Sequence, residues 1–201
     1  MPHSERRGNP TVSSPGLKRP AVFLDRDGTL CEEMGYLNHI SRLKMYSFAA
    51  PAIRRLNQAG WPVIVVTNQS GISRKIFPES LVVEVHERIT EALAAEGAHV
   101  DGYYYCPHQK ADRCECRKPL PGLIARACQE HHLTKEGSWM VGDRYGDLEL
   151  GFAVGARTIL VLTGYGAGDY QWHHGEWPRQ PDHVAEDLSS AVDLILPGNK
   201  S

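Results

Sequence analysis

Short apolar runs alternate with helical segments along this 201-residue chain, and this feature constrains its fold most strongly. The runs are almost continuously apolar, which is typical of strands buried on both faces of a sheet. We predict strands at 21–24, within 62–71, and at 100–106, 138–143 and 157–162. Helices with apolar residues one turn apart are predicted at 49–60, 79–97, 121–133 and 147–155, with a last strand and helix in 182–196. The order predicts an α/β fold with three Rossmann-like layers, a parallel sheet with helices on both faces.

Length and charge narrow the class of protein. The chain is long enough for one full core and short for two domains, so we predict one domain at 20–196. Residues 1–19 are rich in Ser, Pro, Gly and Arg without periodic apolar residues, which predicts a disordered arm. The net charge of −2 gives no field that would attract nucleic acid or an anionic membrane. Without an apolar stretch of signal-peptide or membrane-span length, we expect a cytoplasmic protein with neither partner, and a monomer.

Polar side chains follow three of the predicted strands. They are Asp25 and Asp27 after the first strand, Thr67 and Asn68 after the second, and Asp143 and Asp147 after the fourth. The carboxyl ends of parallel strands meet at one edge of a sheet, where α/β proteins bind ligands. We therefore expect these residues to converge on one site.

The acids of this set suit phosphoryl transfer. Asp25 and Asp143 are hard oxygen ligands of the kind that Mg²⁺ prefers, and the ion would relieve the repulsion between them. Asp25 could attack phosphorus and form an aspartyl-phosphate that water then hydrolyses. Asp27 could protonate the leaving oxygen and later accept a proton from the attacking water.

Charge on the transferring phosphoryl group requires fixed donors. The Thr67 hydroxyl and the Lys118 ammonium could supply them, and Arg117 could hold a second phosphate through a bidentate pair of hydrogen bonds. Taken singly, these motifs also have structural interpretations, as turn residues, a helix cap or a solvated basic pair. Their order at successive strand ends favours the catalytic interpretation.

The motifs 25-DRDGT-29, 67-TNQSG-71, Lys118 and 142-GDRYGD-147 resemble those of haloacid dehalogenase (HAD) superfamily phosphatases over most of residues 21–196. Within that superfamily, 67-TNQSGISR-74 and a C-x-H pair followed by C-x-C-R-K-P resemble the subgroup of histidinol-phosphatases and D-glycero-D-manno-heptose-1,7-bisphosphate 7-phosphatases. The resemblance implies that Asp25 is the nucleophile and Asp27 the acid and base. It also implies that Mg²⁺ is held by the Asp25 side chain, the Asp27 backbone carbonyl and Asp143, with Asp147 assisting through water.

The segment 106-CPHQKADRCEC-116 holds three of the five cysteines, and such clustering favours metal or redox chemistry over a disulfide framework. The resemblance implies that Cys106, His108, Cys114 and Cys116 bind a structural zinc ion. One imidazole and three thiolates form a closed tetrahedral set, which agrees with that role. A reduced cysteine cluster with an exposed histidine is the alternative. Cys31 and Cys128 lie outside the cluster and are predicted to pack in the core.

Loops control access to the expected site. The subgroup lacks a large cap domain, and no insertion of domain size separates the motifs here. In the heptose phosphatases the loop that matches 32–42 touches the sugar, so the resemblance implies substrate contacts for Tyr36 and Leu37, although an apolar loop anchor is an alternative. The Gly-rich and aromatic segment 164–181 is expected to be a surface excursion that packs its own aromatic rings.

The favoured hypothesis is an Mg²⁺-dependent sugar-phosphate phosphatase that acts on heptose 1,7-bisphosphate at C7. It binds substrate through Tyr36, Leu37, Asn68 and Arg117. Histidinol-phosphate phosphatase is the first alternative, with the same chemistry and a different pocket. A nucleic-acid end phosphatase would need a basic stripe, which this mildly acidic chain lacks. A non-catalytic, zinc-stapled metal-binding module is the alternative of another class. Arg144 stands where many relatives carry Lys, and the five residues between His108 and Cys114 form a shorter loop than in many relatives; both bear on substrate choice.

Overall fold

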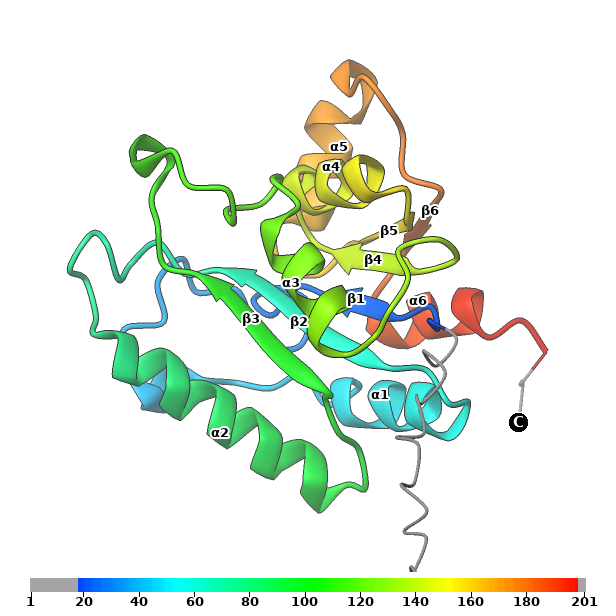
Figure 1. The fold of residues 1–201 in the computed structure, drawn as a ribbon, viewed down its shortest axis with the longest axis horizontal. Helices are drawn as coiled ribbons and strands as arrows, with labels where there is room; N and C mark the ends of the chain where they lie inside the picture. The colour runs from blue at the N-terminus through cyan, green and yellow to red at the C-terminus, as the bar shows by residue number, and fades with distance from the viewer. Residues whose placement is uncertain (1–17, 199–201) are drawn as a thin grey trace, which may run out of the picture.

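Six strands pair in parallel to form one central sheet in the computed structural model, which describes residues 18–198 (Figure 1). The strands are β1 (Val22–Leu24), β2 (Val63–Asn68), β3 (Gly102–Cys106), β4 (Trp139–Gly142), β5 (Arg157–Val161) and β6 (His183–Ala185). Their spatial order is β3-β2-β1-β4-β5-β6. All six predicted strands are confirmed.

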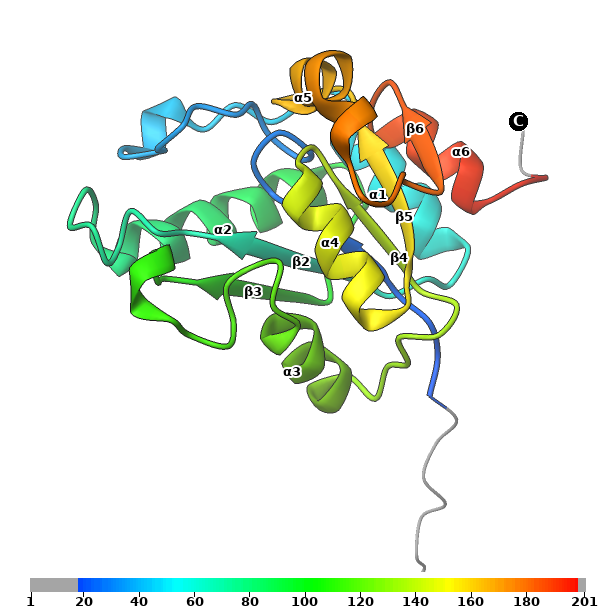
Figure 2. The ribbon, with the colours of Figure 1, turned by 90° about the horizontal axis from the view of Figure 1, so that it is seen from above.

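Helices cover both faces of the sheet (Figure 2). The helices are α1 (Ala49–Gln58), α2 (Glu79–Ala95), α3 (Gly122–Glu130), α4 (Tyr145–Val154), α5 (Gly166–His173) and α6 (Leu188–Ile195), and short 3₁₀ turns occupy Ile40–Arg42, Lys110–Asp112 and His174–Glu176. On one face, α1, α2 and α6 pack against Val22 and Leu24 of β1. On the other face, α3 and α4 pack against Phe23. Because successive strand side chains point to opposite faces, β1 supplies both cores, and the predicted three-layer architecture is confirmed.

The strand order reverses at β1, which places a ligand crevice there. The chain moves from β1 to β2 and β3 on one side, and then to β4, β5 and β6 on the other. Ligands in open α/β sheets bind at such a reversal, beyond the carboxyl ends of the strands. Asp25, Thr67 and Asp143 lie at or directly after the carboxyl ends of the three neighbouring strands β1, β2 and β4.

The segment 164–181 is a surface excursion, as predicted, because Gly166 is its one buried residue, but it contains helical structure that was not predicted. It contains α5 and the 3₁₀ turn His174–Glu176, and α5 is the next element after β5 along the chain. The residues of α5, GAGDYQWH, include two glycines and no continuous apolar stripe, so the local pattern gave little indication of a helix. The prediction that the segment packs its own aromatic rings is confirmed, because Tyr170 stacks on His174 with ring centroids 4.6 Å apart.

Helix α4 begins at Tyr145, two residues earlier than predicted. Asp147 therefore lies in its first turn, where one carboxylate oxygen accepts a hydrogen bond from the Arg144 N–H at 3.1 Å. This bond fixes the Asp147 side chain at the helix start.

Most of the predicted arm, residues 1–17, lies outside the described residues. Within residues 18–198, the longest apolar helices fall short of what a bilayer crossing requires.

Candidate active site

The Asp25 carboxylate is held by two donors at the end of β1. It accepts hydrogen bonds from the Arg26 backbone N–H at 2.7 Å and from the Lys118 ammonium at 2.8 Å. The side chain is nearly buried, and this burial raises the pKa of Asp25 to about 7, against the opposing charge of Lys118. A carboxylate with few competing donors and little water is well placed to attack an electrophile.

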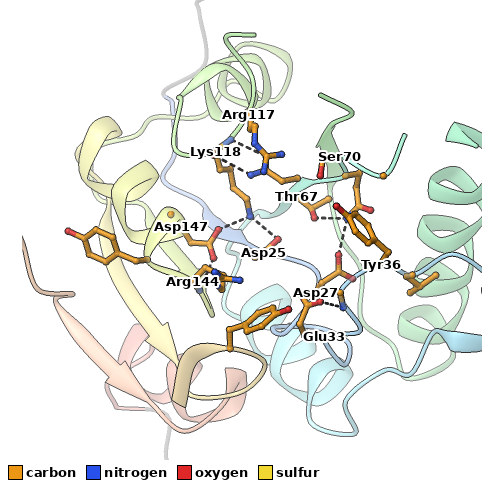
Figure 3. Close-up of a pocket in the computed structure, with 18 of the residues that line it drawn as sticks. Asp25, Asp27, Glu33, Tyr36, Thr67, Ser70, Arg117, Lys118, Arg144 and Asp147 are labelled. Carbon is orange, nitrogen blue, oxygen red and sulfur yellow. Dashed lines mark hydrogen bonds and ion pairs between the residues drawn. The ribbon is translucent and has the colours of Figure 1, made fainter. Parts of the chain in front are cut away.

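Lys118 lies at the centre of the site, where Figure 3 shows its contacts with Asp25 and Asp147. Its ammonium contacts Asp25 at 2.8 Å and Asp147 at 2.7 Å, and donates to the Val66 carbonyl at 2.9 Å. Burial opposes the charge on Lys118, but the two carboxylates outweigh it, so its pKa lies above its ordinary value. The ammonium is thus a fixed positive charge beside the nucleophile.

Asn68 holds the backbone of Lys118 in place. Its carboxamide oxygen accepts from the Lys118 N–H at 3.0 Å and its nitrogen donates to the Lys118 carbonyl at 3.2 Å. Asn68 also lines the cleft. Its contact with the substrate therefore stays a prediction, whereas its contact with the Lys118 backbone is observed.

Three carboxylates form a corner that could hold a divalent cation. Asp25, Asp143 and Asp147 each place one oxygen within 4.8 Å of the others. Asp143 is fully buried; one of its oxygens accepts from the Tyr165 N–H at 2.8 Å, and the other has no partner. Burial, and then the charges of Asp25 and Asp147, raise the pKa of Asp143 to about 8. An unpaired buried oxygen among like charges fits a hard cation such as Mg²⁺.

Asp27 lies beside this corner and is held by residues that the sequence analysis did not single out. The Arg26 guanidinium donates to both of its oxygens, at 3.0 and 2.7 Å, and the Gln69 carboxamide donates to one of them at 2.9 Å. Burial alone would raise the pKa of Asp27, but Arg26 and Gln69 lower it below its ordinary value. The available signal was the Arg inside the D-R-D motif, a charge at the end of a buried strand that requires a partner.

Thr67 is joined to Asp27 through the same carboxamide. The Gln69 nitrogen donates to the Thr67 hydroxyl at 3.0 Å as well as to Asp27. Thr67 and Gln69 are both buried. The Thr67 hydroxyl therefore keeps its own proton free for donation toward the cleft.

A cleft of about 380 Å³ opens above these groups. Its lining includes the predicted residues Asp25, Asp27, Thr67, Asn68, Lys118, Asp147, Tyr36, Leu37 and Arg117 (Figure 3). It also includes Glu33, Arg144 and Asp169, which were not predicted as site residues. The volume is at the small end of ligand pockets and suits a sugar phosphate.

Tyr36 and Leu37 line the cleft and also pack against the hydrophobic core. Leu37 is 7% exposed and belongs to the core, and Tyr36 packs against it, with its ring edge-to-face with Phe77 at 6.4 Å. Both therefore serve as loop anchors, and substrate contact stays a prediction for them.

Arg144 is held on the rim by α5. Its guanidinium donates to Asp169 at 3.0 Å and lies 4.2 Å from the Tyr165 ring centre. The helix that the sequence did not reveal therefore sets the position of a basic side chain at the cleft.

The four predicted zinc ligands come together in the loop after β3. Cys106, His108, Cys114 and Cys116 place their ligand atoms within 4.8 Å of one another. The pairs that involve Cys116 are 3.2 Å to Cys106, 3.3 Å to His108 and 3.6 Å to Cys114. Tetrahedral Zn–S bonds would place two sulfurs about 3.8 Å apart, so the cluster is close to the size required. These thiols are free, with no disulfide among the described cysteines.

Electrostatics favour thiolate formation at one of these ligands. Burial opposes ionisation of Cys114, but the N–H groups of Arg117 and Cys116 lower the pKa of its thiol to about 7. Outside the cluster, Cys31 is fully buried and Cys128 nearly so, as predicted for packing residues.

Comparison with known proteins finds a matching family model and similar proteins that are phosphatases. A family model described as "HAD-hyrolase-like" matches residues 115–191. A D-glycero-D-manno-heptose-1,7-bisphosphate 7-phosphatase of Thermosynechococcus vestitus is 40% identical over 194 residues, covering 89% of this chain and 96% of that protein. A D-glycero-beta-D-manno-heptose-1,7-bisphosphate 7-phosphatase of Pseudomonas aeruginosa is 38% identical over 181 residues, covering 90% and 99%.

A solved structure agrees with them. The D,D-heptose 1,7-bisphosphate phosphatase of B. bronchiseptica, crystallised with magnesium and phosphate, superposes with a TM-score of 0.81 at 31% identity, covering 88% of this chain and 97% of that one.

Proposed function

Since the chain belongs to the HAD superfamily of phosphatases, in the group of the heptose-1,7-bisphosphate 7-phosphatases, we propose that it removes the C7 phosphate of D-glycero-D-manno-heptose 1,7-bisphosphate. The observation that carries the proposal is the Asp25 carboxylate, held 2.8 Å from the Lys118 ammonium at the floor of a cleft that Arg117 also lines. The Asp25 carboxylate and the Lys118 ammonium are placed to act on the reacting phosphate, and Arg117 is placed to bind the distal phosphate. The relatives' names do not favour histidinol phosphate as substrate or a non-catalytic role.

The reaction begins at Asp25. Its free oxygen attacks phosphorus, and the bond from phosphorus to the C7 oxygen breaks. The fixed positive charge of the Lys118 ammonium attracts the phosphoryl oxygens as negative charge builds on them, and the Thr67 hydroxyl donates a hydrogen bond to one of them. The Asp27 carboxyl group transfers its proton to the departing C7 oxygen, so the sugar leaves as a neutral alcohol.

Asp27 then acts in the opposite direction. Its carboxylate takes a proton from a water molecule, which attacks the aspartyl-phosphate and returns Asp25 as a free carboxylate with release of inorganic phosphate. The low pKa of Asp27 favours this base form. A phosphate dianion that enters the cleft adds negative charge beside Asp27, and this favours uptake of the proton needed for the first step.

We propose that Mg²⁺ is the cofactor of this site. The Asp25 side chain, the Asp27 backbone carbonyl and Asp143 would bind it, with Asp147 acting through water. The unpaired buried oxygen of Asp143 supports this assignment. When bound, the ion neutralises charge on the phosphate and on the clustered carboxylates.

We also propose that Cys106, His108, Cys114 and Cys116 bind a structural zinc ion. The Arg117 guanidinium donates to the His108 carbonyl at 3.0 Å, so an ion in this loop would also fix the direction of Arg117. The role of the zinc ion is then to position Arg117 for its contact with the distal phosphate, rather than to act on the substrate.

We keep the remaining expectations from the sequence as proposals. The partner is a small phosphorylated sugar, the protein acts in the cytoplasm, and it is a monomer without nucleic-acid or membrane partners.

Phosphate release with Mg²⁺ tests the proposal. The substrates are both anomers of heptose 1,7-bisphosphate, histidinol phosphate, simple sugar phosphates and a 3′-phosphorylated oligonucleotide, with Asp25→Asn as control. A large preference in kcat/KM for one heptose bisphosphate anomer, lost in Asp25→Asn, supports the function and identifies the anomer. A preference for histidinol phosphate would refute the substrate, and activity that survives in Asp25→Asn would refute the nucleophile.

A further inference from the structure

Arg26 is an unusual residue for the interior of a small α/β domain. It is 1% exposed and is the largest fully buried side chain among residues 18–198. Buried arginines require a fixed partner, because water is absent and the guanidinium keeps its charge. Here that partner is the Asp27 carboxylate, through the Nε and Nη2 atoms.

Stability alone does not account for Arg26. Its third nitrogen, Nη1, is buried without a hydrogen-bond partner, and so is the Nε2 atom of His86 on α2. His86 is kept neutral, with its pKa lowered to about 3 by burial and by the charge of Arg26. Leaving such groups unpaired costs free energy, and an apolar residue of similar size would avoid that cost.

The grip on Asp27 leaves one side of the carboxylate open. Arg26 approaches as a bidentate fork along the edge of the carboxylate, and the Gln69 carboxamide adds a third donor. The Asp27 side chain nevertheless remains 20% exposed, and Asp27 lines the cleft. A planar fork fixes both the position and the rotation of a carboxylate, which a single ammonium cannot do.

We propose that Arg26 is a positioning residue that, with support from Gln69, orients the Asp27 carboxyl group toward the leaving oxygen of the substrate. The proposal rests on the phosphatase function proposed above. Arg26 does not touch the substrate; it determines where the oxygen of Asp27 that carries the proton lies. Its loss should therefore slow only the step in which the leaving group needs a proton.

Comparison of two leaving groups tests this inference. The leaving group of an alkyl phosphate, such as the sugar phosphate that the enzyme hydrolyses best, would be an unstable alkoxide without protonation, so it requires the proton. 4-Nitrophenyl phosphate leaves as a stable phenolate and does not. The parameter kcat/KM reports the steps up to departure of the leaving group, so it excludes the later action of Asp27 on water.

Arg26→Lys keeps the charge and loses the fork. We expect its kcat/KM to fall about 100-fold on the sugar phosphate and to stay within about threefold of wild type on 4-nitrophenyl phosphate. Binding of inorganic phosphate in the presence of Mg²⁺, measured by calorimetry, should stay within about threefold, because Arg26 makes no phosphate contact. Arg55→Lys is the matched control: Arg55 also pairs with an aspartate, Asp193, but lies outside the cleft lining, and this variant should match wild type on both substrates.

Equal losses on the two substrates, or no loss on the sugar phosphate, would overturn the inference. If Arg26→Lys does not fold, as judged by circular dichroism, Gln69→Leu tests the same grip by removing the third donor. It should lower kcat/KM more on the sugar phosphate than on the aryl phosphate, and an equal loss would again overturn the inference. If wild type prefers a different alkyl phosphate, the proposed substrate fails while the leaving-group comparison still decides the role of Arg26.

Discussion

Gly28 tests how closely the backbone packs against the proposed metal corner. Its φ is +79°, and a Cβ atom added there would lie 2.1 Å from one carboxylate oxygen of Asp143 and 2.4 Å from its Cγ. Gly60 has the same φ, and nothing lies within 4 Å of its added Cβ. The pair therefore separates backbone strain from the clash with Asp143.

The magnitudes follow from these distances. Both alanine variants bear the cost of a left-handed residue, about 1–2 kcal/mol. Gly28→Ala must also move the Asp143 carboxylate by about 1.3 Å, from 2.1 Å to an ordinary contact of 3.4 Å, which adds about 1–3 kcal/mol of overpacking. A displacement of about 1 Å at a reacting group can lower the rate by about 100-fold.

We expect Gly60→Ala to lose about 1–2 kcal/mol in urea unfolding with its kcat/KM and Mg²⁺ affinity unchanged. Gly28→Ala should lose more stability, bind Mg²⁺ more weakly by calorimetry, and lose about 100-fold in kcat/KM. Equal stability losses in the two variants, with wild-type Mg²⁺ affinity for Gly28→Ala, would refute the view that Gly28 is required for the position of Asp143.

Two further predictions concern the metals. Cys114→Ser should lower the zinc content of the purified protein by metal analysis and lower its Tm; unchanged zinc content would contradict the zinc assignment. In protein freed of magnesium, Asp25 and Asp143 have pKa values raised from 3.8 to about 7 and about 8, so the stability from their protonated forms is present below pH 3.8 and is lost as pH rises through 7 and 8. Added Mg²⁺ should therefore raise the Tm more at pH 8 than at about pH 5.5, and an equal shift at both pH values would contradict this account of the carboxylates.

The sequence by itself was sufficient for the architecture and for the convergence of the acidic and basic side chains at one edge of the sheet. Strands and helices follow from local apolar periodicity, which β1 and α2 display clearly, and the parallel arrangement follows from their alternation. Convergence of Asp25, Thr67 and Asp143 followed because the carboxyl ends of parallel strands share one edge. The predicted zinc ligands lie within eleven residues, so short-range chain geometry already brings them close.

The contacts that orient these groups required the tertiary structure. The fork of Arg26 on Asp27 has no periodic signal in the sequence, because the burial of Arg26 near His86 of α2 arises only in the folded chain. The residues of α5 have little intrinsic helix propensity. The helix forms where Asp169 binds Arg144, which is distant in the sequence, and where the Tyr170 ring packs against Trp177. Local patterns depend on neighbours along the chain, whereas charge burial and the direction of a carboxylate depend on residues that only the fold brings together.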